Sequence, residues 1–169
     1  MKRVPDVVFV FRENGDFVKR NSAEIFGGKR VVLFSLPGAF TPTCSSYQLP
    51  GYEENYERIL EAGVDEVYCI SVNDGFVMNA WAKDLGIERV KLIPDGNADF
   101  TTSLGMDVEK RNLGFGRRSW RYAAVINDGM IEQLFEEPGK VGNCYEDPYE
   151  VSDPQTVLNY LHSYAKKNA

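Results

Sequence analysis

The segment Pro37-Gly38-Ala39-Phe40-Thr41-Pro42-Thr43-Cys44 separates a short apolar run from a polar, periodic stretch of the chain. The apolar run, residues 31–34, reads Val-Val-Leu-Phe and is typical of a buried strand. Beyond Cys44, apolar and aromatic residues recur at helical spacing as far as Gly63, a plausible helix stop. We therefore expect a central strand, a proline-bent loop and a helix start, with Cys44 at the junction.

A cysteine at a helix start lies in an unusual environment. The first N–H groups of a helix have no partner within the helix, and they lie at the positive end of its dipole. This environment stabilises the thiolate, which is the nucleophilic form of cysteine. Cys44 is therefore a candidate nucleophile, and the alternative is a structural cysteine buried behind a strand.

The rest of the chain predicts an α/β fold with a mixed central sheet flanked by helices. Apolar runs at 64–72 and 90–93 alternate with helical patterns, which indicates parallel βαβ units. Asn-Gly and Asp-Gly turns predict an N-terminal hairpin and a second hairpin near the C-terminus. The expected segments are strands at 7–12, 16–19, 119–126 and 130–135, helices at 76–85, 98–104 and 156–165, an exposed loop at 109–112, and a long loop at 136–154.

Composition excludes several classes of protein. The 169 residues suffice for a single domain over 1–169, and a net charge of −6 without a basic stripe excludes nucleic acid as a partner. No apolar run approaches the roughly 20 residues that cross a bilayer, so no membrane partner is expected. The N-terminus lacks a secretory apolar segment, which favours a cytoplasmic location.

The cysteines are Cys44, Cys69 and Cys144, and none forms a Cys-x-x-Cys pair. With His162 as the single histidine, the ligands for a usual zinc site are too few, so no metal is expected. Cys69 lies within an apolar run and is interpreted as a small buried residue. A cysteine hydrolase would need a histidine base, and His162 lies in the terminal helix, where we expect it to be half-exposed.

The spacing of Pro37, Thr41 and Cys44, Pro-x-x-x-Thr-x-x-Cys, resembles the peroxidatic-cysteine loop of the peroxiredoxins. The neighbouring Leu-Pro-Gly-Tyr at 49–52 extends the likeness to the type-five branch, which contains atypical two-Cys enzymes and peroxiredoxin–glutaredoxin hybrids. The resemblance runs from about residue 17 to 161. It implies a thioredoxin-like fold, with the N-terminal hairpin as an insertion. The implied activity is reduction of hydrogen peroxide and small alkyl hydroperoxides without a cofactor.

The resemblance also implies roles for individual residues. Cys44 attacks the peroxide and becomes a sulfenic acid. Thr41 places its hydroxyl beside the sulfur and donates to the near peroxide oxygen, while Pro37 and Pro42 fix the loop and shield the sulfur from water. The family's strand-borne arginine falls on Arg121, within Arg-Ser-Trp-Arg-Tyr at 118–122.

Two further arginines, Arg117 and Arg118, precede Arg121 in the sequence. Arg118 is the second choice for the arginine beside the sulfur, and Arg117 is expected to be solvated.

The sequence leaves the reductant open. Cys144 is a candidate resolving residue, which would form a Cys44–Cys144 disulfide reduced by thioredoxin. The alternative is a one-Cys cycle served by glutathione or a separate glutaredoxin, since no further redox motif follows the core. A further alternative to an enzyme is a non-enzymatic peroxide sensor or chaperone, which would use the same oxidisable thiol.

Resemblance alone implies a homodimer. The aromatic residues Phe115, Trp120 and Tyr47, read as exposed, are compatible with such an interface.

Overall fold

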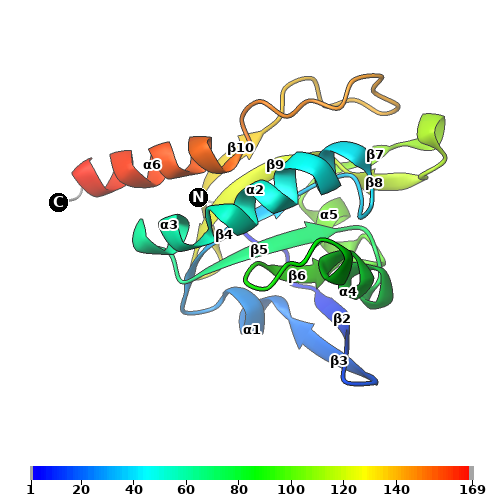
Figure 1. Ribbon diagram of the computed structural model, residues 1–169, viewed down its shortest axis with the longest axis horizontal. Helices are drawn as coiled ribbons and strands as arrows, with labels where there is room; N and C mark the ends of the chain where they lie inside the picture. The colour runs from blue at the N-terminus through cyan, green and yellow to red at the C-terminus, as the bar shows by residue number, and fades with distance from the viewer. Residues whose placement is uncertain (1, 168–169) are drawn as a thin grey trace.

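The computed structural model describes residues 2–167 and contains a central sheet with helices on both faces (Figure 1). The strands are β1 (Lys2–Arg3), β2 (Val8–Glu13), β3 (Asp16–Asn21), β4 (Arg30–Ser35), β5 (Glu66–Ser71), β6 (Lys91–Pro94), β7 (Asp107–Glu109), β8 (Arg117–Ser119), β9 (Tyr122–Asn127) and β10 (Met130–Glu136). The helices are α1 (Ser22–Phe26), the π-helix η1 (Cys44–Gln48), α2 (Leu49–Glu54), α3 (Tyr56–Glu61), α4 (Gly75–Asp84), α5 (Asp99–Ser103), the 3₁₀-helix η2 (Arg111–Leu113) and α6 (Pro154–Lys167).

The main sheet is mixed, as predicted, with the strand order β1-β10-β9-β4-β5-β6. β4, β5 and β6 pair in parallel, and β9 pairs antiparallel with β4 and β10. The N-terminal hairpin β2–β3 forms a separate two-stranded sheet that lies beside α1 and below β6 in Figure 1. The predicted βαβ units and both hairpins are therefore confirmed.

Alternate side chains of the central strands pack into two hydrophobic cores, one on each face of the sheet. On β4, Val32 and Phe34 face a core shared with α2, α3, α4 and α6, whereas Val31 and Leu33 face a core shared with α1, α5 and β2. All four side chains are fully buried, which fixes the register of the strand because a one-residue slip would exchange the two faces. The carboxyl end of β4 thus holds the 36–43 loop in a fixed place.

The structure differs from the sequence-based expectation between residues 107 and 121. The expected exposed loop at 109–112 belongs to a hairpin in which β7 pairs with β8, and Lys110 is buried. The expected strand at 119–126 is interrupted at Trp120 and Arg121, between β8 and β9. Trp120, expected to be exposed, is 1% exposed and donates from Nε1 to Glu137 O at 2.7 Å.

No helix among residues 2–167 is both long enough and apolar enough to cross a membrane. The expectation of one domain over 1–169 remains a prediction.

Candidate active site

Cys44 lies in the first turn of a helical segment that begins at Pro42. Ser45 N donates to Thr41 O at 2.9 Å, which closes the first turn, and Leu49 N bonds back to Cys44 O as a π-turn. The wider turn coincides with Pro50, which has no N–H to continue an α-helical ladder. The expected junction of strand, loop and helix start is therefore present, and the Cys44 side chain is fully buried within it.

Arg121 is the cation that reaches the Cys44 sulfur. Its Nη1 lies 3.5 Å from Cys44 Sγ and also donates to Oε1 of Gln48, which is one helical turn further along. Arg121 is only 1% exposed, so its charge acts on the sulfur with little screening by water. The amide nitrogen Nε2 of Gln48 is buried beside this pair and has no hydrogen-bond partner in the described residues.

A distant loop fixes the other side of the Arg121 guanidinium. Nη2 forms an ion pair with Asp147 Oδ1 at 2.6 Å, and Nε donates to Pro148 O at 3.1 Å. Burial disfavours the charged form of Arg121, but the charges of Cys44 and Asp147 and the hydrogen bonds to them outweigh that cost and raise its pKa. The guanidinium is thus held charged and oriented towards the sulfur.

Glu137 in turn anchors this loop. Its fully buried carboxylate accepts from the backbone N–H groups of residues 150, 151 and 152 and from Ser152 Oγ, at 2.6–2.9 Å. Its own backbone N–H donates to Arg121 O at 3.2 Å. Sequence reasoning missed Glu137, Asp147 and Gln48, because no local pattern relates them to Cys44.

Arg118 contacts the loop that precedes Cys44 rather than the sulfur itself. Its Nη1 donates to Pro37 O at 3.1 Å, and its Nε donates to Phe115 O at 3.2 Å. Burial lowers the pKa of Arg118, opposed by the nearby Cys44 charge. Arg117 is largely exposed, as expected, and pairs with Asp107 and Glu109 at 2.6 and 2.8 Å.

Thr41 lies at the start of the turn that carries Cys44, and the proton of its hydroxyl is already engaged. Thr41 Oγ1 donates to Gly38 O at 2.7 Å, so in this arrangement the hydroxyl oxygen can accept a hydrogen bond but not give one. Pro37 and Gly38 are buried, whereas Pro42 is exposed. Asn73, two residues after the end of β5, accepts from Ala39 N at 3.0 Å and ties the loop to the segment that follows the neighbouring strand.

The other two cysteines differ in their surroundings. Cys69 is fully buried in β5, and burial, followed by the charge of Cys44, raises the pKa of its thiol well above the usual range, with Arg121 acting in the opposite sense. Cys144 is half-buried in the 137–153 loop and packs against the core on the α1 side, whereas Cys44 belongs to the core on the α6 side. All three thiols are free.

The remaining candidates lie as follows. His162 is exposed on α6, and no histidine base accompanies Cys44 in the described residues. Residues 2–167 hold no cluster of three or more histidine, cysteine or acidic side chains that could bind a metal. Tyr47 is 66% exposed, whereas Phe115 is only half-buried.

The arrangement supplies a thiol, a fixed cation and a buried donor around one atom. A sulfur in such a site can act as an anion towards an electrophile, and charge that develops on the electrophile meets the guanidinium.

Comparison with known proteins gives one consistent family. The family model described as Redoxin matches residues 2–157. A peroxiredoxin of Sinorhizobium fredii is 54% identical over 96% of this chain and 92% of its own length. The hybrid peroxiredoxin of Haemophilus influenzae is 49% identical over 95% of this chain, which spans 65% of that protein.

A solved structure gives the same result. The antioxidant protein of Plasmodium falciparum, described as a 1-Cys peroxiredoxin, superposes with a TM-score of 0.92 at 38% identity, covering 96% of this chain and 97% of that one.

Proposed function

The chain belongs to the peroxiredoxins, which are thiol peroxidases of the Redoxin family. We propose that the sulfur of Cys44 is the atom that attacks the peroxide. The observation that supports this assignment most strongly is the contact of 3.5 Å between Arg121 Nη1 and Cys44 Sγ. Of the three cysteines, Cys44 alone has such a contact in the described residues. The thioredoxin-like fold and the type-five branch of the family agree with the resemblance found in the sequence.

In the proposed step, the Cys44 thiolate attacks one oxygen of the peroxide. An S–O bond forms while the O–O bond breaks, and the proton of the attacked oxygen passes to the second oxygen, which leaves as water or an alcohol. Cys44 is left as a sulfenate, which takes a proton from water to become the sulfenic acid. Negative charge grows on that leaving oxygen, and the Arg121 guanidinium stabilises it. The free Gln48 Nε2 is a second donor for the same oxygen.

Thr41 and Pro37 orient the peroxide and protect the sulfur. The Thr41 oxygen, whose proton is held by Gly38 O, can accept a hydrogen bond from the peroxide O–H. Pro37 is buried in the loop before Cys44 and is held through its carbonyl by Arg118. Because Cys44 has no exposed surface in this conformation, entry of the peroxide requires its cover to move.

We propose that glutathione, directly or through a glutaredoxin, returns the sulfenic acid to the thiol. This choice is supported by the relative described as a 1-Cys peroxiredoxin. A second candidate is a Cys44–Cys144 disulfide reduced by thioredoxin. It is favoured by the placement of Cys144 in a half-buried loop, but it requires that loop to move.

The test is peroxide consumption with excess reductant at substoichiometric protein. Wild-type protein should turn over many times, and Cys44→Ser should lose turnover. If consumption stopped after one equivalent of peroxide, the protein would be a sensor rather than an enzyme. A chaperone activity that persists after Cys44 is oxidised would indicate a chaperone. Full turnover by Cys44→Ser would remove Cys44 from the mechanism.

Two further parts of the proposal concern the whole molecule. We propose a homodimer, supported by the exposed Phe40 and Tyr47 on either side of Cys44 in the sequence, at 52% and 66% exposure. Trp120, which the sequence indicated as an exposed aromatic residue, is buried and is left out of the proposed interface. A cytoplasmic location also remains a proposal, and it is supported by three free thiols.

A further inference from the structure

A cavity of about 320 Å³ lies against the outer side of the 37–43 loop. Thr41, Pro42 and Thr43 form one wall, the β7–β8 hairpin forms the second, and residues 144–147 form the third. Figure 1 shows these three segments converging at one end of the molecule, beside the start of η1. Its volume is at the lower end of the range for small-molecule sites, roughly 300–1,000 Å³.

Lys110 lines this cavity, and no acidic side chain of residues 2–167 pairs with its ammonium group. The residue is only 2% exposed, and in the described residues the one interaction of its ammonium group is with the ring of Trp120, whose centroid lies 5.5 Å from Nζ. Buried ammonium groups are normally paired, because removal from water without a partner is costly. An unpaired, buried cation that lines a cavity is therefore a place where an anionic ligand gains free energy on binding.

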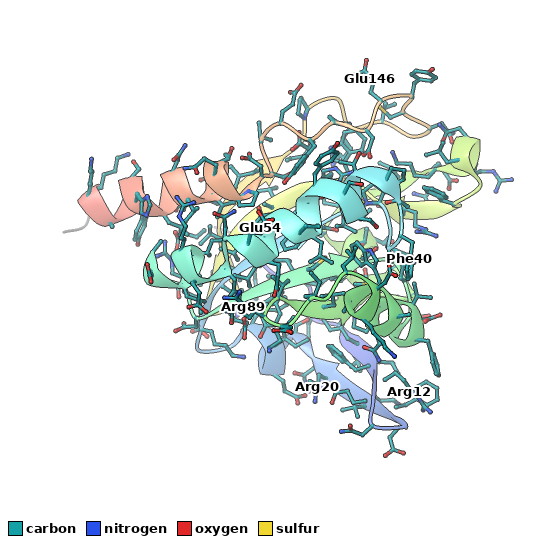
Figure 2. The ribbon with its side chains drawn as sticks, viewed as in Figure 1. Arg12, Arg20, Phe40, Glu54, Arg89 and Glu146 are labelled. Atoms are coloured by element: carbon teal, nitrogen blue, oxygen red, sulfur yellow. The ribbon has the colours of Figure 1, made fainter. Side chains whose placement is uncertain are left out.

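The acidic residues in the cavity wall leave this charge available. Asp147 is occupied by Arg121 at 2.6 Å. Glu146 is exposed, and Figure 2 shows it at the outer edge of its loop, pointing away from the sheet. Thr43, the residue before Cys44, adds a hydroxyl to the same wall.

We propose that this cavity binds the reductant, and that the reductant is a low-molecular-weight thiol whose carboxylate pairs with Lys110. This inference rests on the proposed function, because it concerns the step that follows peroxide reduction. The wall formed by Thr41–Thr43 places such a ligand next to the first turn that carries Cys44. Glutathione fits this class, since it combines a thiol with two carboxylates and an ammonium group.

The chemistry balances with that thiol as the only co-reactant. The thiol sulfur attacks the sulfur of Cys44–SOH, an S–S bond forms, and the S–O bond breaks with loss of water. A second thiol then attacks the mixed disulfide, releasing the oxidised thiol and restoring Cys44. Lys110 takes no part in either bond change and acts on the binding of the thiol.

The experiment compares wild-type protein with Lys110→Met, which keeps the length and apolar stem of the side chain. Peroxidase turnover is measured with glutathione and with cysteamine, a thiol without a carboxylate. A charge-assisted contact of this kind changes affinity by roughly 10- to 100-fold. We expect Lys110→Met to raise the glutathione concentration at half-maximal rate by that factor, with cysteamine turnover and the rate of Cys44 oxidation unchanged.

The matched control is Lys140→Met, which removes the same charge from an exposed position in the 137–153 loop. It should leave both thiols unaffected. Equal effects of Lys110→Met on glutathione and cysteamine, or no effect on either, would overturn the proposal. If that variant does not fold, the turnover of wild-type protein is measured with glutathione and with the diamide of glutathione, which has no carboxylate. Equal concentrations of the two thiols at half-maximal rate would overturn the proposal. A wild-type protein that turns over only with glutaredoxin or thioredoxin would also overturn it, whereas a wild-type protein inactive with every reductant would contradict the proposed function instead.

Discussion

Replacing Glu137 with glutamine tests whether the 147–149 loop positions the Arg121 guanidinium. The Glu137 carboxylate accepts from Glu150 N through Oε1, at 2.8 Å, and from three donors of residues 151 and 152 through Oε2, at 2.6–2.9 Å. In Glu137→Gln, the least costly arrangement puts the new NH₂ group at the Oε1 position. It then faces the Glu150 N–H, so that two buried donors meet.

The expected loss of stability follows from that mismatch. One unsatisfied buried donor costs about 1–3 kcal/mol. For a domain of this size, such a change lowers the melting temperature by roughly 2–12 °C. The strain falls on the backbone that leads to Asp147 and Pro148, which hold Arg121 at 2.6 and 3.1 Å. Small misplacements at a reacting centre cost as much as about 100-fold in rate, so oxidation of Cys44 should slow by roughly 10- to 100-fold.

The assay is stopped-flow measurement of Cys44 oxidation by hydrogen peroxide, together with thermal unfolding. The matched control is Glu132→Gln on β10, which breaks the 2.6 Å ion pair with Arg30 at the opposite end of that strand. It should lower the melting temperature and leave the oxidation rate unchanged. The positioning role of Glu137 would be refuted if Glu137→Gln lost stability but oxidised at the wild-type rate, or if both variants slowed equally.

Three further predictions concern other parts of the molecule. Gly38→Ala should slow Cys44 oxidation several-fold without unfolding the protein, because the added Cβ would overlap with Nη1 of Arg118; an unchanged stopped-flow rate would contradict this. Cys144→Ser should retain turnover with glutathione, and loss of that turnover in the coupled assay would favour the two-Cys cycle. Burial and a hydrogen bond to Glu132 raise the pKa of Tyr160 to about 12, so the folded protein keeps a phenol proton that the unfolded chain loses near pH 10. The free energy of unfolding should therefore fall between about pH 10 and about pH 12, and it should fall less steeply in Tyr160→Phe. Urea titrations across this pH range measure the difference.

The elements and residues predicted most successfully have strong local signals. The apolar run at 31–34 and the Asn-Gly turn at 14–15 correctly indicate a central strand and a hairpin. The spacing from Pro37 to Cys44 indicates a loop before a helix start, and both features are present. Arg121 was found through its sequence context, although the continuous strand expected around it is interrupted.

The parts that were missed depend on contacts between distant segments. Asp147 and Glu137 lie in a long polar loop without periodicity, and only the folded chain brings them to Arg121. Lys110 lies in a charged stretch that predicts exposure, yet a paired hairpin carries it onto the ring of Trp120. In each case tertiary packing, rather than local preference, decides the environment.

The most direct test is the rate and site of oxidation by one equivalent of hydrogen peroxide, followed by intact mass and peptide mapping. Wild-type protein should gain one oxygen on Cys44 when no reductant is present, and Arg121→Met should do so about 100-fold more slowly or worse while remaining folded. Wild-type rates in Arg121→Met, or oxygen found first on Cys69 or Cys144, would contradict the account of a Cys44 anion held by a buried guanidinium.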